Sequence, residues 1–223
     1  MDSKIRVLDI NIDSCSAKEA MKKTVEYMGT DPVNVVEMAT VNGLMQMDSM
    51  GQLKEDICRF DMVLAGDKTI LEAADITDRK CLQETEGRVF LRMFMRYLHK
   101  NHKRIYLLVE SEEEGQKFFD YLQRNYYGQQ VVGLAKVSAQ NRADDMLVND
   151  INGTEADCIL AALGSPLQEE FIVKNRSLLD VRLWLGLGKE YIPVTRTGIG
   201  QCRLAQFFIK RIFKKEIEKS KRR

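Results

Sequence analysis

The sequence predicts an α/β protein: a mostly parallel sheet with helices on both faces, Rossmann-like in class, followed by a basic amphipathic C-terminal helix. Short apolar runs alternate with segments of helical periodicity along most of the chain, which is typical of parallel sheets with helical crossovers. Several runs end in Gly, Ser, Thr, Asn or Asp, the residues that begin turns and cap helices. A content of 44% hydrophobic and 30% charged residues suits a chain that buries a core.

We expect one domain over residues 1–197 and a tail over 198–223. The predicted strands are residues 5–12, 33–39, 61–65, 104–109, 130–134, 158–163 and 178–187. The predicted helices are 17–28, 44–58, a short one ending at 74, then 87–99, 112–126, 141–152 and one beginning at 166. The second strand is interrupted by a single acid, Glu37, and the polar stretch 75–86 is expected to be irregular.

The composition argues against several classes of protein. The net charge of +1 gives no field that would attract nucleic acid. Five dispersed cysteines without a CxxC pair indicate a reduced, cytosolic protein, and the N-terminus has no apolar run of signal-peptide length. The two histidines, His99 and His102, have no acidic neighbours, so we expect no metal. There is no Walker A, GxGxxG or GxSxG motif, and we expect no cofactor.

The stretch from Asp157 to Gln168 predicts a buried strand, a tight turn and a helix. Its apolar run breaks at Gly164-Ser165-Pro166, and proline suits the first turn of a helix. Ligands of open α/β sheets collect at the carboxyl ends of the strands, beside helix N-termini. Gly164, Ser165, Pro166 and Gln168 are therefore candidate binding residues, although an ordinary strand-to-helix turn explains the pattern equally well.

Two further strands end in polar residues that would reach the same edge. Thr40 and Asn42 follow the strand at 33–39 and are candidates for substrate binding. Asp67 follows the strand at 61–65, where a carboxylate can act as general base toward a hydroxyl nucleophile. The alternative for Asp67 is a helix N-cap with Lys68 beside it.

The tail, residues Arg203 to Arg223, combines an apolar helical face with clustered lysine and arginine. Leu204, Phe207, Phe208 and Ile212 share that face. A basic amphipathic helix of this kind is typical of a membrane-surface element. The alternative is a helix docked on its own domain or on a partner subunit.

Three separated pieces resemble the WecG/TagA/CpsF glycosyltransferase family. Leu163-Gly164-Ser165-Pro166-Leu167-Gln168-Glu169 is similar to the family's G-x-P-K-Q-E, Thr40-Val41-Asn42 to its T-x-N, and Asp61-Met62-Val63-Leu64-Ala65 to the strand before its D-G loop. The resemblance implies transfer of an N-acetylmannosamine-type sugar from a UDP donor to an undecaprenyl-diphosphate-linked acceptor, in teichoic acid or other cell-surface polysaccharide synthesis. It further implies a peripheral enzyme at the inner face of the cell membrane, no metal, and self-association through helices.

The chain also departs from the family pattern. The family's D-G motif reads Gly66-Asp67 in this chain. The arginine and the aspartate that the family has in the segment matching Glu84 to Val89 have no assigned counterparts. The family's glycine-bearing loop is replaced by an acidic segment at 110–114. The R-A-P motif has no clear counterpart near the C-terminus. These changes motivate a second hypothesis, a paralogue that kept the fold, lost activity and acts as a binding or scaffolding partner. A generic nucleotide-binding protein is a third, which the absence of a glycine-rich phosphate loop disfavours.

Overall fold

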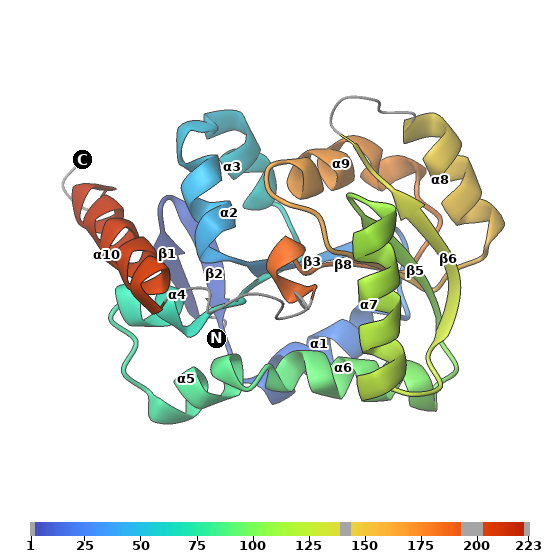
Figure 1. The fold of residues 1–223 in the computed structure, drawn as a ribbon, viewed down its shortest axis with the longest axis horizontal. Coiled ribbons are helices and arrows are strands. Elements are labelled where there is room, and N and C mark those ends of the chain that lie inside the picture. Colours follow the sequence, from blue (N-terminus) through green and yellow to red (C-terminus); the bar gives the residue numbers. More distant parts are fainter. Residues whose placement is uncertain (1–2, 139–143, 193–202, 221–223) are drawn as a thin grey trace.

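The computed structural model describes the backbone of residues 3–138, 144–192 and 203–220, and the side chains of residues 4–138, 144–192 and 211–219 (Figure 1). Its centre is a 6-stranded sheet in the order β4-β3-β8-β7-β5-β6, in which all neighbouring strands are parallel. The strands are β3 (Asn34–Ala39), β4 (Met62–Ala65), β5 (Arg104–Val109), β6 (Gln130–Lys136), β7 (Cys158–Ala161) and β8 (Leu183–Gly186). The predicted parallel α/β class is confirmed.

Helices cover both faces of this sheet, as Figure 1 shows. On one face lie α1 (Ala17–Tyr27), α6 (Val89–Lys100) and α7 (Glu112–Asn125). On the other lie α2 (Val41–Gln46), α3 (Gly51–Ile57), α8 (Asp144–Gly153) and α9 (Leu167–Asn175). Each face buries its own apolar cluster, because successive side chains of a strand point to opposite sides.

The strand β3 illustrates how this alternation positions the later site. Val36 and Met38 join the cluster under α1 and α6, whereas Val35 and Ala39 join the cluster under α2 and α9. Glu37 therefore points toward α9, into an otherwise apolar layer. In that layer Phe171 of α9 stacks on Trp184 of β8 with ring centroids 5.7 Å apart.

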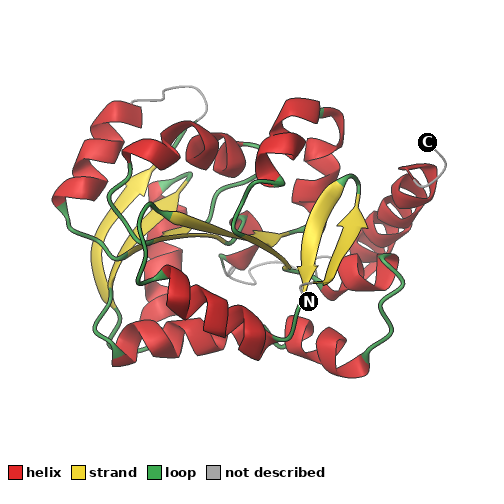
Figure 2. Cartoon of the chain, turned by 180° about the vertical axis from the view of Figure 1, so that it is seen from behind, coloured by secondary structure: helices red, strands yellow, loops and turns green. Residues whose placement is uncertain are grey.

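The prediction of a single strand over residues 5–12 is wrong. The segment forms an antiparallel hairpin of β1 (Ser3–Val7) and β2 (Ile10–Ser14). Its two-residue turn places Leu8 and Asp9 at φ of 47° and 67°, as a hairpin of matching twist requires. Figure 2 shows this hairpin as the pair of strands beside the N-terminus. Asp13 holds the hairpin beside β4 by accepting a hydrogen bond of 2.9 Å from the Val63 amide.

Two helix predictions also differ from the structure. The stretch expected to be irregular contains α5 (Arg79–Glu86), which begins at an Asp78 cap and buries none of its residues. Cys81 and Leu82 are its two apolar residues, too few to form the repeated apolar stripe from which a helix is predicted. The predicted helix 44–58 is divided into α2, a 3-10 turn (Met47–Ser49) and α3, with Met50 outside helical dihedrals at φ −103° and ψ 73°.

The helix α10 (Arg203–Ser220) lies beside α4 (Lys68–Ala73) at one end of the molecule (Figure 1). Phe213 and Ile217 are buried in the core cluster that contains Ile70, so the described part of α10 is docked on its own domain. The expected boundary between residues 197 and 198 lies outside the described residues. Among the described helices, none combines the length and apolarity needed to cross a bilayer.

Candidate active site

Four loops that follow the strands β3, β4, β7 and β8 meet at the carboxyl edge of the sheet. Because these strands are parallel, their following residues all leave at the same edge. Thr40 follows β3, Gly66 and Asp67 follow β4, and Gly164 follows β7. Since β3 and β8 lie between β4 and β7, the strand spacing separates Asp67 from the loop after β7 by roughly 14 Å.

Thr40 and Ser165 stand close to each other around Gly43. Thr40 is the N-cap of α2, and its Oγ1 accepts a 3.0 Å hydrogen bond from the Gly43 amide. A Cβ on Gly43 would lie 3.1 Å from Thr40 Oγ1 and 2.7 Å from Ser165 Oγ, so glycine leaves room for both hydroxyls. The two hydroxyls line one small recess together with Gln168 and Gly188.

Gln168 uses its side chain to tie three strand ends together. It is 1% exposed, and its Oε1 accepts hydrogen bonds of 3.2 Å from the amides of Leu163 and of Gly188. Its Nε2 donates to the carboxyl group of Glu37 on β3. Gln168 thus forms the floor of the recess, with both polar atoms bonded within the protein.

Two buried acids flank Gln168, and sequence reasoning did not assign either to the site. Glu37 and Glu169 are 3% and 2% exposed. Burial raises the pKa of Glu37 well above the usual range, and the charge of Glu169 raises it further. Burial also raises the pKa of Glu169, against a hydrogen bond from Ser165 that lowers it. The effect is the larger on Glu37, so at neutral pH we assign a proton to Glu37.

The raised pKa of Glu37 makes the stability of the fold depend on pH in a defined direction. The folded protein keeps a proton on Glu37 that the unfolded chain releases above its ordinary value of 4.5, so this contribution to stability decreases as pH rises. Its slope is at most about 1.4 kcal/mol per pH unit. We therefore expect the free energy of unfolding of Glu37→Gln, relative to that of wild type, to increase steadily from about pH 5 to about pH 8 in urea titrations. A stability difference independent of pH would contradict this assignment.

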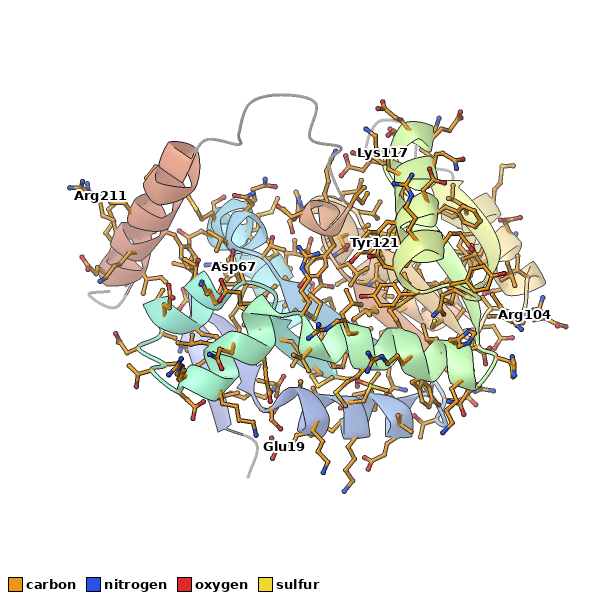
Figure 3. All side chains as sticks on the ribbon, turned by 60° about the horizontal axis from the view of Figure 1, so that its bottom comes forward. Glu19, Asp67, Arg104, Lys117, Tyr121 and Arg211 are labelled. Atoms are coloured by element: carbon orange, nitrogen blue, oxygen red, sulfur yellow. The ribbon has the colours of Figure 1, made fainter. Side chains whose placement is uncertain are left out.

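Asp67 is exposed at the rim and is the N-cap of α4, where one oxygen accepts a 2.6 Å hydrogen bond from the Thr69 amide. The capping role considered from the sequence is thus present, and Lys68 pairs with Glu86. Figure 3 shows Asp67 toward the end of the molecule that carries α10, on which Arg211 points away from the body.

Arg88 places a cation at the rim near Asp67. It belongs to the segment 84–89, in which the sequence offered no assigned counterpart of the family's arginine. The guanidinium of Arg88 lies 4.4 Å from the centroid of the Tyr191 ring. The hydroxyl of Tyr191 donates a 3.2 Å hydrogen bond to the Gly66 carbonyl, directly before Asp67. Glu84, by contrast, accepts from the Ala17 amide at 2.9 Å and serves the start of α1.

The 3-10 turn Lys189–Tyr191 links the remaining loops across the edge. Lys189 pairs with Glu110 at 2.9 Å and with Glu114 at 3.0 Å, so two carboxylates of the acidic segment have a cationic partner. Glu110 also accepts a 2.6 Å hydrogen bond from the Gly164 amide. Glu190 accepts one of 3.0 Å from Asn42.

The predicted site residues therefore fall into two groups at one edge. Thr40, Ser165 and Gln168 share the recess, and Pro166 is the N-cap of α9 above it. Asp67 follows β4, on the other side of β3 from Ser165. The 3-10 turn after Gly188 connects Asp67 with the recess, because Tyr191 of this turn donates its hydrogen bond to the Gly66 carbonyl. Arg88, Lys189 and Tyr191 carry no motif in the sequence, since only the fold brings them to this edge.

Comparison with known proteins shows the family of the chain. A search of curated proteins gave no match. The model of the glycosyl transferase WecG/TagA/CpsF family matches residues 5–191, which include every strand of the sheet and all the site residues described above. The chain belongs to the WecG/TagA/CpsF family of glycosyl transferases.

Proposed function

We propose that the protein transfers an N-acetylmannosamine-type sugar from a UDP donor to an undecaprenyl-diphosphate-linked acceptor, in teichoic acid or other cell-surface polysaccharide synthesis. The observation that carries the proposal is the convergence of Thr40, Asp67 and Ser165 on one edge of a sheet whose chain belongs to this transferase family. The loops after β4 and β7 are roughly 14 Å apart by strand spacing, the span that a nucleotide sugar and an acceptor hydroxyl would cover along this edge.

Asp67 acts as general base in this proposal. Its carboxylate is exposed at the rim, and capping of α4 uses one of its two oxygens. It takes the proton of the acceptor hydroxyl while that oxygen forms a bond to the anomeric carbon. The bond between the anomeric carbon and the phosphate oxygen breaks, and UDP leaves with the electron pair.

Arg88 is the cation best placed to meet the donor diphosphate. Its guanidinium stacks on Tyr191 and is exposed at the rim. A stacked guanidinium presents its N–H donors in a fixed plane, which suits phosphate oxygens. Lys189 is already held by Glu110 and Glu114, so it serves mainly to neutralise these acids near the donor.

The basic surface of α10 supports a place at the inner face of the membrane. Arg211, Lys214, Lys215 and Lys219 are exposed, whereas Phe213 and Ile217 are used for docking. The membrane contact that we propose is therefore electrostatic over this part of the helix. Each basic residue near an anionic leaflet contributes about 1 kcal/mol.

A paralogue without activity is the second candidate, and one observation favours it. The side-chain nitrogen of Asn42, both polar atoms of Gln168 and the ammonium of Lys189 are bonded within the protein. A site whose ligand contacts are occupied in this way could serve as a binding or scaffolding surface in the same pathway.

A transfer assay separates the two candidates. UDP release is measured from UDP-N-acetylmannosamine with an undecaprenyl-diphosphate-linked acceptor in anionic vesicles. Turnover supports the enzyme, whereas UDP binding without turnover supports the paralogue.

Changing Arg211, Lys214 and Lys215 to glutamate should weaken sedimentation with the vesicles at least tenfold. The matched control, Lys18→Glu with Lys22→Glu on α1, should not, and equal loss in both variants would contradict the role of α10.

A further inference from the structure

Two arginines converge at the start of α6. Arg88 immediately precedes this helix and Arg92 lies one turn further along it, and both residues are exposed. The guanidinium of Arg88 lies over the ring of Tyr191. The side chain of Arg92 is directed back toward the helix start, because its Nη2 lies 3.6 Å from the position of a Cβ on Gly87. Both guanidinium groups are therefore found at the same end of α6.

The titration of two tyrosines agrees with this placement. Burial raises the pKa of Tyr126 to about 12, and the charges of Arg92 and Arg88 act on it in the opposite direction. Burial also raises the pKa of Tyr191 to about 12, where the charge of Arg88 lowers it and that of Asp67 raises it. Both arginines thus lie near Tyr126, and Arg88 shares the surroundings of Tyr191 with the proposed base.

Neither arginine is neutralised by the protein. Within the part of the chain that the structure describes, the side chains of Arg88 and Arg92 form no ion pair and no hydrogen bond. Three acids near this rim are bonded to other residues, namely Glu86 to Lys68, Glu190 to Asn42 and Glu114 to Lys189. The positive charge of the two guanidinium groups therefore remains available to a ligand.

This arrangement is unfavourable unless an anion is bound. Like charges four residues apart on a helix repel each other, and Arg88 and Arg92 have this spacing. The helix dipole adds to the cost, since it disfavours cations at the start of α6. An anion between the two groups would offset both effects. Each planar guanidinium can donate two parallel hydrogen bonds to one phosphoryl group, so a pair of them matches a diphosphate.

We propose that Arg88 and Arg92 together bind a diphosphate, one guanidinium to each phosphoryl group. The inference rests on the proposed function and adds Arg92 to the site as its second cation. In that function a diphosphate has two sources, the UDP of the donor and the lipid-linked acceptor. The chemistry that the two arginines recognise is common to both sources, and the choice of probe tells them apart.

Calorimetry with UDP and with geranyl diphosphate, a short water-soluble prenyl diphosphate, tests the inference on wild type, Arg92→Gln and Arg96→Gln. We expect Arg92→Gln to weaken binding of at least one probe about tenfold, as for the loss of a hydrogen bond between charged groups. A loss confined to UDP assigns the pair to the donor, a loss confined to geranyl diphosphate assigns it to the acceptor, and a loss with both probes shows that it accepts either.

Arg96→Gln is the matched control. Arg96 is exposed one turn beyond Arg92 on the same helix, so this variant has the same change in net charge at a greater distance from Arg88. It should bind both probes as wild type does. Glutamine is a good helix former, so both variants should keep the melting temperature of wild type.

Three results would overturn the inference. Arg92→Gln that binds both probes as wild type does removes Arg92 from the site. Equal losses in Arg92→Gln and Arg96→Gln show an effect of net charge alone, and wild type that binds neither probe shows that there is no diphosphate site. The proposed function is decided separately, because it fails only if wild type shows no sugar transfer.

Discussion

Replacing Asp67 with asparagine is expected to lower the rate of sugar transfer by about 10²-fold to 10⁴-fold, the usual contribution of a general base. Asparagine caps helices as well as aspartate does, so α4 should keep its N-cap bond to the Thr69 amide. The change therefore removes the proton acceptor with little effect on the fold. The rate is measured as UDP release at saturating donor, with the melting temperature as a check on folding.

Asp78 provides the matched control for this prediction. It is also an exposed N-cap aspartate, bonded to the Cys81 amide at 2.8 Å at the start of α5. Asp78→Asn should leave the transfer rate within about twofold of wild type, because the change keeps a cap and removes no proposed base. Equal rates for wild type and Asp67→Asn, or equal losses in both variants, would remove Asp67 from the mechanism.

Replacing Gly186 with alanine is expected to destabilise the fold by about 3 kcal/mol, the upper part of the range for overpacking a core. Gly186 pairs in register with Glu37, and a Cβ there would lie 2.5 Å from Glu37 Cδ and 2.6 Å from its Oε1. The carboxyl group is buried and bonded to Gln168, so it has little room to move away. The free energy of unfolding is measured by urea titration.

Two further variants identify the cause of this loss. In Gly186→Ala with Glu37→Ala the clashing group is absent, so the double variant should be more stable than the sum of the single changes implies. Gly153→Ala is the control, since a Cβ on Gly153 meets no atom within 4 Å. A Gly186→Ala protein as stable as wild type would show that Glu37 does not lie across Gly186.

The sequence was informative about the strands and about the edge at which they end. The alternation of apolar runs and helical segments predicted the parallel sheet, and β5 has the predicted bounds of 104 and 109. Thr40, Asp67 and Ser165 were found because each follows an apolar run, and parallel strands carry such residues to one edge. The motif around Gln168 identified the family, which the match over residues 5–191 confirms.

Other features depend on contacts between distant parts of the chain, which a local pattern does not contain. Leu8 and Asp9 form the hairpin turn in left-handed conformations that neither residue type usually adopts, and burial of Leu8 at 2% exposure helps to offset their cost. Glu37 was visible as a lone acid in an apolar strand. Its role became clear only when the fold placed it against Gln168 and Gly186.

Hydrogen exchange of backbone amides with and without UDP is the most direct test of the central claim, that the loops after β3, β4, β7 and β8 form one nucleotide-sugar site. The account predicts slower exchange on adding UDP in residues 40–43, 66–69, 164–168 and 188–191 together. Protection confined to another surface, such as the groove of Arg6, Asp48 and Lys54 between the hairpin and α3, would contradict it. Absence of any protection at saturating UDP would contradict it as well.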